Sequence, residues 1–163
     1  MSPFDLSLLR PGDCLLYRPH GIIGWVIAIK TWHLVAHVEV YEGDGFSLAS
    51  RDGIGCNRYR LRTAELCRVL RPTGRIDMAS GVAWFEKVAR GQKYDFAALA
   101  RFLWPGGTDT DRDRQICSSF AARFYRAAGY PLFAATEDAD RIAPFQFAVT
   151  PLLDDVWSDG QAI

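Results

Sequence analysis

Polar and hydrophobic residues alternate in the first half of the chain with the period of two that is typical of β-strands. Residues 35–41, VAHVEVY, show this most clearly, and their β-branched residues favour a strand. Turn signals such as EGDG and RDGIG separate shorter runs. These runs predict further strands at residues 13–18, 46–50, 56–61 and 66–72. The mostly apolar run GIIGWVIAIKTW instead predicts a short buried helix over residues 21–31.

From residue 77 onward, the pattern becomes helical, with hydrophobic residues spaced by three and four positions. The predicted helices cover residues 77–92, 95–104 and 116–129. Asp77 and Gly91 stand at the two ends of the first helix, which is the asymmetry expected of helix caps. Gly129 ends the third helix in the same way.

The last segment, residues 131–163, is apolar but interrupted by prolines, so we expect a short helix and an extended strap across the surface. A β-rich half at about residues 10–72 is followed by a helical half at about residues 77–130, which indicates an α+β fold. With 163 residues, the chain is long enough for one domain with a substantial core and too short for two ordinary ones. We therefore expect residues 1–163 to form a single domain.

Composition and charge narrow the classes of function. Apolar residues make up 49% of the chain and charged residues 23%, which is typical of a soluble globular protein. The 19 Lys and Arg residues balance the 19 Asp and Glu residues, so the excess positive charge that bulk nucleic-acid binding needs is missing. No export signal and no apolar run of membrane-spanning length is found. We expect a protein that is cytoplasmic as synthesised. We expect it to bind no nucleic acid and to have no membrane-spanning segment.

Four cysteines stand at positions 14, 56, 67 and 117, without a CxxC pair or a histidine at zinc-ligand spacing. A cytoplasmic chain with a substantial core does not need disulfides, so we predict four free thiols. No metal site and no cofactor are predicted. The question is then which of the thiols is reactive.

Cys117 lies in the first turn of the predicted helix over residues 116–129. It belongs to an apolar stripe that continues through Phe120, Ala121, Phe124 and Ala128. The helix N-terminus favours a thiolate, and its backbone N–H groups can stabilise an oxyanion on a substrate carbonyl. The same stripe is equally typical of a small buried core residue. Cys117 is therefore a candidate nucleophile whose partner must come from elsewhere.

His37 is the strongest candidate for that partner among the three histidines. On the strand at residues 35–41 it shares a face with Glu39, whereas the expected core face carries Ala36, Val38 and Val40. A carboxylate beside an imidazole fixes its orientation and basicity, as the base of a cysteine nucleophile requires. His20 and His33 lie in a turn and at a helix end, without such a neighbour.

Four segments together resemble a known family: RPGDCLLYRP, AHVEVYEGDGFSLASRDGIG, KYDFAAL and ICSSFAARFYRAAGYPL. They are similar in type and order to the permuted NlpC-type cysteine peptidases and amidases, and within these to the YiiX-like branch of bacteria and phages. These are papain-like enzymes in which the histidine strand precedes the cysteine helix. The resemblance extends from about residue 10 to residue 133. It implies a circularly permuted papain-like fold with an antiparallel sheet or small barrel packed on helices.

The resemblance also implies roles for individual residues. Cys117 matches the nucleophile and His37 the general base. Tyr94 matches a tyrosine that lines the oxyanion side, although a tyrosine here is as typical of core packing. Ser118, next to the nucleophile, is expected to line the same side. The family's usual glutamate two residues after the cysteine is Ser119 in this chain.

The third polar partner of the histidine departs from the family pattern. The position that supplies it in many relatives is Ala49 here, which cannot orient an imidazole. The alternatives are Ser47 or Ser50 through a bulge, or Glu39 from the histidine's own strand. We favour Glu39, because it shares the face of His37 and carries a charge.

The resemblance predicts a cysteine-dependent amide hydrolase that acts on the peptide or amide bonds of cell-wall peptides. A phage-encoded enzyme released to the cell wall and a cytoplasmic recycling enzyme are both compatible with this prediction. One alternative is a thioester-forming acyltransferase or lipid-directed hydrolase, like the relatives of lecithin retinol acyltransferase. Another is a degenerate, non-catalytic virion or binding module, which the alanine at position 49 favours.

Overall fold

An antiparallel sheet of six strands lies at the centre of the computed structural model, which describes residues 4–95, 114–134 and 136–160. The strands are β1 (Cys14–Tyr17), β2 (His37–Gly43), β3 (Phe46–Arg51), β4 (Gly55–Arg60), β5 (Leu66–Pro72) and β8 (Leu153–Ser158). Their order across the sheet is β4-β3-β2-β1-β5-β8, and every neighbouring pair is antiparallel. The fold is therefore α+β with an antiparallel sheet, as the sequence predicts.

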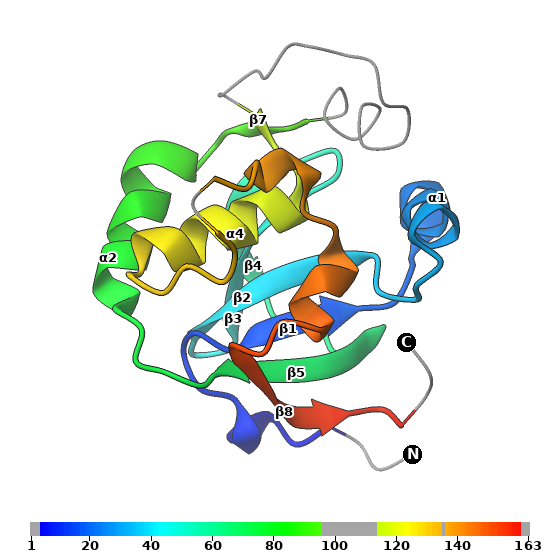
Figure 1. The fold of residues 1–163 in the computed structure, drawn as a ribbon, viewed down its shortest axis with the longest axis horizontal. Helices are drawn as coiled ribbons and strands as arrows, with labels where there is room; N and C mark the ends of the chain where they lie inside the picture. The colour runs from blue at the N-terminus through cyan, green and yellow to red at the C-terminus, as the bar shows by residue number, and fades with distance from the viewer. Residues whose placement is uncertain (1–3, 96–113, 135, 161–163) are drawn as a thin grey trace.

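Helices surround this sheet (Figure 1). They are α1 (Gly21–Thr31), α2 (Met78–Trp84), which continues into the π-helical turn η2 (Phe85–Ala89), and α4 (Cys117–Ala127). Short 3₁₀ turns are η1 (Leu6–Leu8), η3 (Ala139–Arg141) and η4 (Pro144–Ala148). A separate parallel pair joins β6 (Lys93–Tyr94) to β7 (Arg114–Gln115). Figure 1 shows α2 and α4 together on one side, whereas α1 stands apart at the other.

Both faces of the sheet are covered by hydrophobic residues. Val38 and Val40 of β2 face α4 and pack in one core with Phe120 and Phe124, which confirms the predicted core face of this strand. The opposite face forms a second cluster around Leu15, Tyr17, Tyr41, Leu66 and Val69. Glu39 lies on this second face and is fully buried. The sheet therefore positions a carboxylate within a hydrophobic layer rather than at a solvated surface.

The first helix of the helical half ends earlier than predicted. The helix expected over residues 77–92 begins at Met78 behind an Asp77 cap and ends in the π-helical turn at Ala89. The Asp77 carboxylate accepts the Ser80 N–H at 3.1 Å, as an N-cap does. The helix predicted over residues 95–104 lies outside the described residues.

The C-terminal segment does more than cross the surface, so the predicted strap is wrong in this part. Residues Leu153–Ser158 join the sheet as the edge strand β8 beside β5. Arg68 on β5 forms a two-pronged ion pair with Asp155 of β8. The acidic pair in LLDDVW therefore belongs to a paired strand with charged side chains at the sheet edge.

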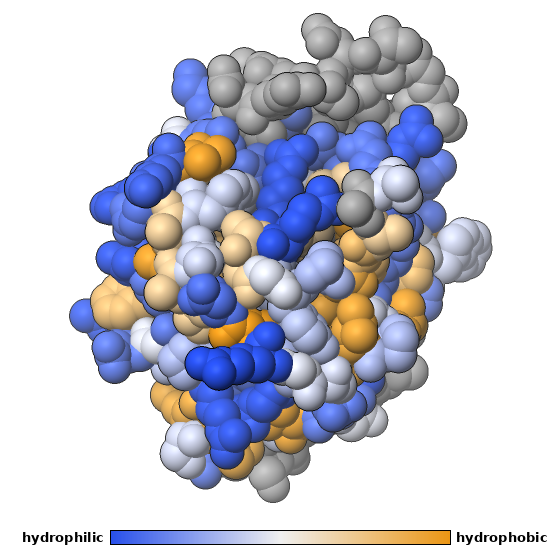
Figure 2. Space-filling model, turned by 60° about the vertical axis from the view of Figure 1, so that its left-hand side comes forward, coloured by the Kyte–Doolittle hydropathy of each residue, from blue (hydrophilic) through white to orange (hydrophobic). Residues whose placement is uncertain are grey.

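Helix α1 is not buried, which contradicts the prediction for residues 21–31. Only Gly24, Ile27 and Ala28 on this helix are buried. Ile23 is half-buried, and the remaining large apolar residues are exposed to solvent: Ile22 (85%), Trp25 (53%), Val26 (38%), Ile29 (69%) and, just after the helix, Trp32 (91%). The side of the molecule that carries α2 instead mixes hydrophilic residues with small hydrophobic areas (Figure 2). None of the helices within the described ranges is long and apolar enough to cross a membrane.

Candidate active site

Cys117 is the first residue of α4, and the local sequence places it there. Ile116, the N-cap residue, has an extended backbone, and its N–H donates to the Ser119 hydroxyl at 3.1 Å. Ser119 thus caps the helix. The predicted stripe after Cys117 is buried throughout, which turns the thiol inward with 2% exposure. The backbone N–H groups of Cys117 and Ser118 have no partners within the helix, because the first turn lacks preceding carbonyls.

His37 is the first residue of β2, and its side chain lies between Glu39 and Cys117. Its Nε2 atom is 3.0 Å from Glu39 Oε1. Cys117 also interacts with this ring, because it raises the pKa of His37 together with Glu39. Since Nε2 is engaged by the carboxylate, Nδ1 is the ring nitrogen left for the sulfur. The side chain retains 16% exposure, so substrate can reach the ring.

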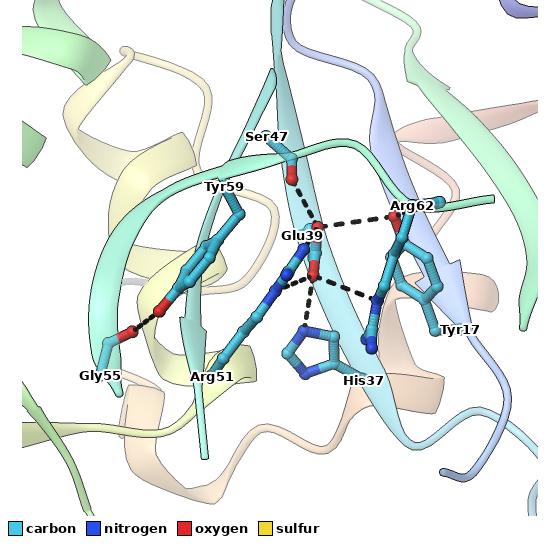
Figure 3. Close-up of polar contacts among 8 residues, drawn as sticks. All are labelled: Tyr17, His37, Glu39, Ser47, Arg51, Gly55, Tyr59 and Arg62. Atoms are coloured by element: carbon cyan, nitrogen blue, oxygen red, sulfur yellow. Dashed lines mark hydrogen bonds and ion pairs between the residues drawn. The ribbon is translucent and has the colours of Figure 1, made fainter. Parts of the chain in front are cut away.

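The Glu39 carboxylate is the centre of the polar network drawn in Figure 3. Arg51 donates to it from Nε at 2.9 Å and from Nη2 at 3.1 Å, as a two-pronged ion pair. The Ser47 hydroxyl donates to Oε2 at 2.5 Å. Tyr17 OH lies 3.5 Å from Oε2, and Arg62 Nε lies 3.8 Å from Oε1. A fully buried carboxylate is thereby paired with cations and supplied with hydrogen bonds.

The electrostatics of this pair favour charged forms at neutral pH. Burial alone would raise the pKa of Glu39, but hydrogen bonds and charge from His37 and Arg51 lower it to about 2. Burial alone would lower the pKa of His37, but Cys117 and Glu39 raise it to about 9. The carboxylate therefore stays ionised, and the imidazole holds its proton against the buried carboxylate.

Of the three candidates for the histidine's partner, one contacts the imidazole ring and two bind other groups. Glu39 contacts the ring directly. Ser47 contacts the carboxylate instead of the ring, and Ser50 donates to the backbone carbonyl of Gln115 at 2.6 Å. Ala49 is buried on β3 beside them.

Sequence reasoning missed Arg51, which holds the carboxylate from the end of β3. The signal was available, because residues 47, 49 and 51 share one face of a strand by the period of two. That face contains Ser47 and Arg51, and both donate to Glu39. A search of the returning strand for side chains that donate hydrogen bonds to Glu39, rather than to His37, would have found Ser47 and Arg51.

Tyr94 and Ser118 line a narrow, mostly apolar cavity with Cys117, of about 10 Å³. Tyr94 lies on strand β6 and is 6% exposed. Ser118 is fully buried, and its hydroxyl makes no hydrogen bond with any of the described residues. The volume is enough for about one water-sized group. The Ser118 hydroxyl could therefore donate a hydrogen bond to a small polar atom that occupies this cavity next to Cys117.

A second and larger cavity of about 310 Å³ is lined in part by His37. Ile27 of α1 and Tyr94 line both cavities, so the two are adjacent. The larger one has polar walls that include His37, Arg51 and Arg62. His37 lines only the larger cavity, and Cys117 lines only the narrow one.

The other three cysteines have environments that suppress thiolate formation. All four thiols are free, as predicted. Burial raises the pKa of Cys14 far above its usual range, and it raises those of Cys56 and Cys67 to about 11. Among the cysteines, only Cys117 stands at a helix N-terminus beside a histidine.

Comparison with known proteins identifies solved structures of similar fold. No protein-family model matches the chain, and no curated protein matches it. The chain is similar to the metalloprotein YiiX of Escherichia coli O157:H7, a DUF1105 protein, with a TM-score of 0.69 and 14% sequence identity. The match covers 92% of this chain and 97% of that one. At this identity the likeness shows a YiiX-like fold.

The described residues do not supply a donor set for a metal centre of the kind that a metalloprotein holds. In residues 4–95, 114–134 and 136–160, no group of three or more His, Cys, Asp or Glu side chains is placed to hold a metal ion. Both oxygens of Glu39 already accept hydrogen bonds from Arg51, and a guanidinium at this place competes with a cation. The described site is instead built of a thiol, an imidazole and a neutralised carboxylate.

Proposed function

We propose that the protein is a cysteine-dependent amide hydrolase with the permuted papain-like arrangement, in which the histidine strand precedes the cysteine helix. The observation that carries this proposal is the contact chain from Cys117 through His37 to Glu39. Nucleophilic cysteine catalysis requires a thiol that is activated by a nearby imidazole. Here the thiol stands at a helix N-terminus, and the imidazole is held by a carboxylate through Nε2. The order of β2 and α4 along the chain agrees with the permutation.

Each step follows from the positions of these groups. The Cys117 thiolate attacks the substrate carbonyl, and the carbonyl electron pair moves to oxygen. Backbone N–H groups at the start of α4 and the Ser118 hydroxyl stabilise this oxyanion. As the C–N bond breaks, His37 gives its proton to the leaving amine and a thioester remains on Cys117. A water then loses a proton to His37 and attacks the thioester, which releases the carboxylic acid and restores the thiolate–imidazolium pair.

Glu39 acts in this scheme as a positioning residue. It keeps the ring oriented through Nε2 and stabilises the imidazolium, while Arg51 and Ser47 keep the carboxylate itself in place. We propose cell-wall peptides as the substrate class, because the permuted NlpC-type resemblance favours them. The cavity beside His37 supports a substrate that extends past the scissile bond.

Trapping of the acyl-enzyme tests the proposed function. The purified protein is incubated with cell-wall peptide fragments and quenched, and Cys117 is examined by peptide mass spectrometry for an acyl adduct that hydroxylamine removes. We expect the adduct on wild type, none on Cys117→Ala, and product release at the wild-type rate for Cys56→Ala, which changes a buried thiol elsewhere. A panel of amides that gives neither adduct nor product would favour a non-catalytic binding module.

A second candidate function is a lipid-directed hydrolase or a thioester-forming acyltransferase, and the exposed apolar face of α1 favours it. Trp25, Ile29 and Trp32 border a hollow of about 270 Å³ on this face. The inner side of the same helix supplies Ile27 to both cavities of the site. Amphipathic residues such as tryptophan are typical of helices that lie in a membrane interface. Faster thioester formation with vesicle-embedded acyl substrates than with peptides would favour this function over the first.

A further inference from the structure

The larger cavity beside His37 has an arginine-rich wall whose charges are unevenly neutralised. Arg18, Arg51 and Arg62 all line it. Arg18 forms a two-pronged ion pair with Asp159 at 2.9 and 3.0 Å, and Arg51 forms the matching pair with Glu39. Both of these guanidinium groups are therefore neutralised by a carboxylate of suitable geometry.

Arg62 lacks such a partner. Its guanidinium lies over the ring of Tyr17, 4.6 Å from the ring centroid. Its Nε atom is buried, and its separation of 3.8 Å from Glu39 Oε1 is too long for a hydrogen bond. Among the described residues, the Arg62 side chain makes no hydrogen bond.

Glu39 cannot satisfy Arg62 because its own acceptor sites are already taken. Its two oxygens accept from His37, Ser47 and both nitrogens of Arg51. A carboxylate offers about four such sites. One guanidinium is thus left on the cavity wall with free donors, held in place by stacking on an aromatic ring.

We propose that Arg62 binds an anionic group of the substrate, a carboxylate or a phosphate, in the cavity beside His37. This inference rests on the proposed function, because it takes the ligand to be part of the substrate. The planar fork of a guanidinium matches both kinds of anion. Asp52 lines the same cavity and is exposed, so it disfavours ligands with several negative charges.

The two adjacent cavities then divide the substrate. The scissile carbonyl lies at Cys117, beside the narrow cavity, and the anionic group lies in the larger cavity that His37 and Arg62 line. Ile27 and Tyr94 border both spaces and separate the two parts. The substrate class is therefore an amide that carries one negative group near the scissile bond.

Ligand titration followed by NMR at pH 7.5 tests this inference without any turnover. The probes are N-acetylglycine for the carboxylate, methyl phosphate for the phosphate, and N-acetylglycinamide as the neutral control. We expect an anion to bind wild type and to bind Arg62→Gln about 10-fold to 100-fold more weakly, the range for a lost charge-assisted hydrogen bond. Arg62→Lys should fall between them, because it keeps the charge and loses the fork. Whichever acid binds more tightly identifies the anion.

Arg60→Gln is the matched control, because Arg60 is also an arginine over an aromatic ring, 6.0 Å from the Phe46 centroid, and does not line the cavity. It should bind the anions like wild type. Binding of both N-acetylglycine and methyl phosphate no tighter than N-acetylglycinamide, or undiminished anion binding by Arg62→Gln, would overturn the inference and leave the hydrolase proposal standing. Arg62-dependent binding in a protein that forms no acyl adduct would instead remove the proposed function and leave the anion site.

Discussion

Replacement of Arg51 by glutamine should destabilise the protein far more than the same change at Arg58. The two arginines form similar ion pairs: Arg51 donates twice to Glu39, and Arg58 donates twice to Glu42. Their burial differs: the side chains of Arg51 and Glu39 are 19% and 0% exposed, whereas those of Arg58 and Glu42 are 38% and 16% exposed. Removing one partner of a buried pair leaves an uncompensated charge, which costs about 3 to 5 kcal/mol. An exposed pair contributes at most about 1 kcal/mol.

For Arg51→Gln we expect the free energy of unfolding to fall by about 3 kcal/mol, at the low end of the range for a broken buried pair. His37 still donates to the carboxylate, and Arg62 lies 3.8 Å from it. Urea unfolding at pH 7.5 measures both variants, and repeating it at high salt separates them further. Salt should weaken only the effect of Arg58→Gln, because exposed charges are screened more than buried ones. Equal losses for the two variants would refute the argument that the buried carboxylate depends on Arg51.

Three further outcomes follow from the same structure. Because the pKa of Glu39 is lowered to about 2 from an ordinary 4.5, its stabilisation is complete above about pH 5 and is lost as the pH falls toward 2. Urea unfolding should show a loss on the order of 3 kcal/mol in wild type, and little in Glu39→Gln. Gly55→Ala places a Cβ 2.1 Å from a backbone oxygen at φ +95°. Its melting temperature should fall well below that of Gly53→Ala, which has open space, and an equal fall would refute the clash. Replacing Trp25 and Trp32 by serine should reduce co-sedimentation with anionic vesicles if α1 contacts lipid, and unchanged sedimentation would exclude this contact.

Local periodicity was sufficient to predict the strands of the first half and the faces of β2 and α4. The core side of β2 follows from its alternation, and the inward direction of Cys117 follows from the three-and-four spacing after it. Both are properties of neighbouring residues, so they are visible in the sequence alone. The contact between His37 and Glu39 also depends only on two positions of one strand.

Other features depend on contacts between distant segments, and the sequence does not show them. Arg51 reaches Glu39 through the pairing of β2 and β3, which requires the register as well as the alternation. Strand β8 forms because its edge pairs with β5, whereas its two aspartates and the prolines that precede it indicate an irregular segment. Helix α1 is as apolar as a buried helix, but the fold covers only its Gly24, Ile27 and Ala28 side. Hydrophobicity predicts a helix there without deciding what covers it.

The central claim is that His37, held by Glu39, activates Cys117. The most direct test is the rate at which iodoacetamide alkylates each cysteine at pH 7.5, measured by peptide mass spectrometry on wild type and His37→Gln. We predict that wild-type Cys117 reacts at least about 100-fold faster than Cys14, Cys56 and Cys67, whose thiols hold their protons at this pH, and that His37→Gln removes most of this difference. Alkylation of Cys117 at the rate of the other three, or at an unchanged rate without His37, would contradict the account.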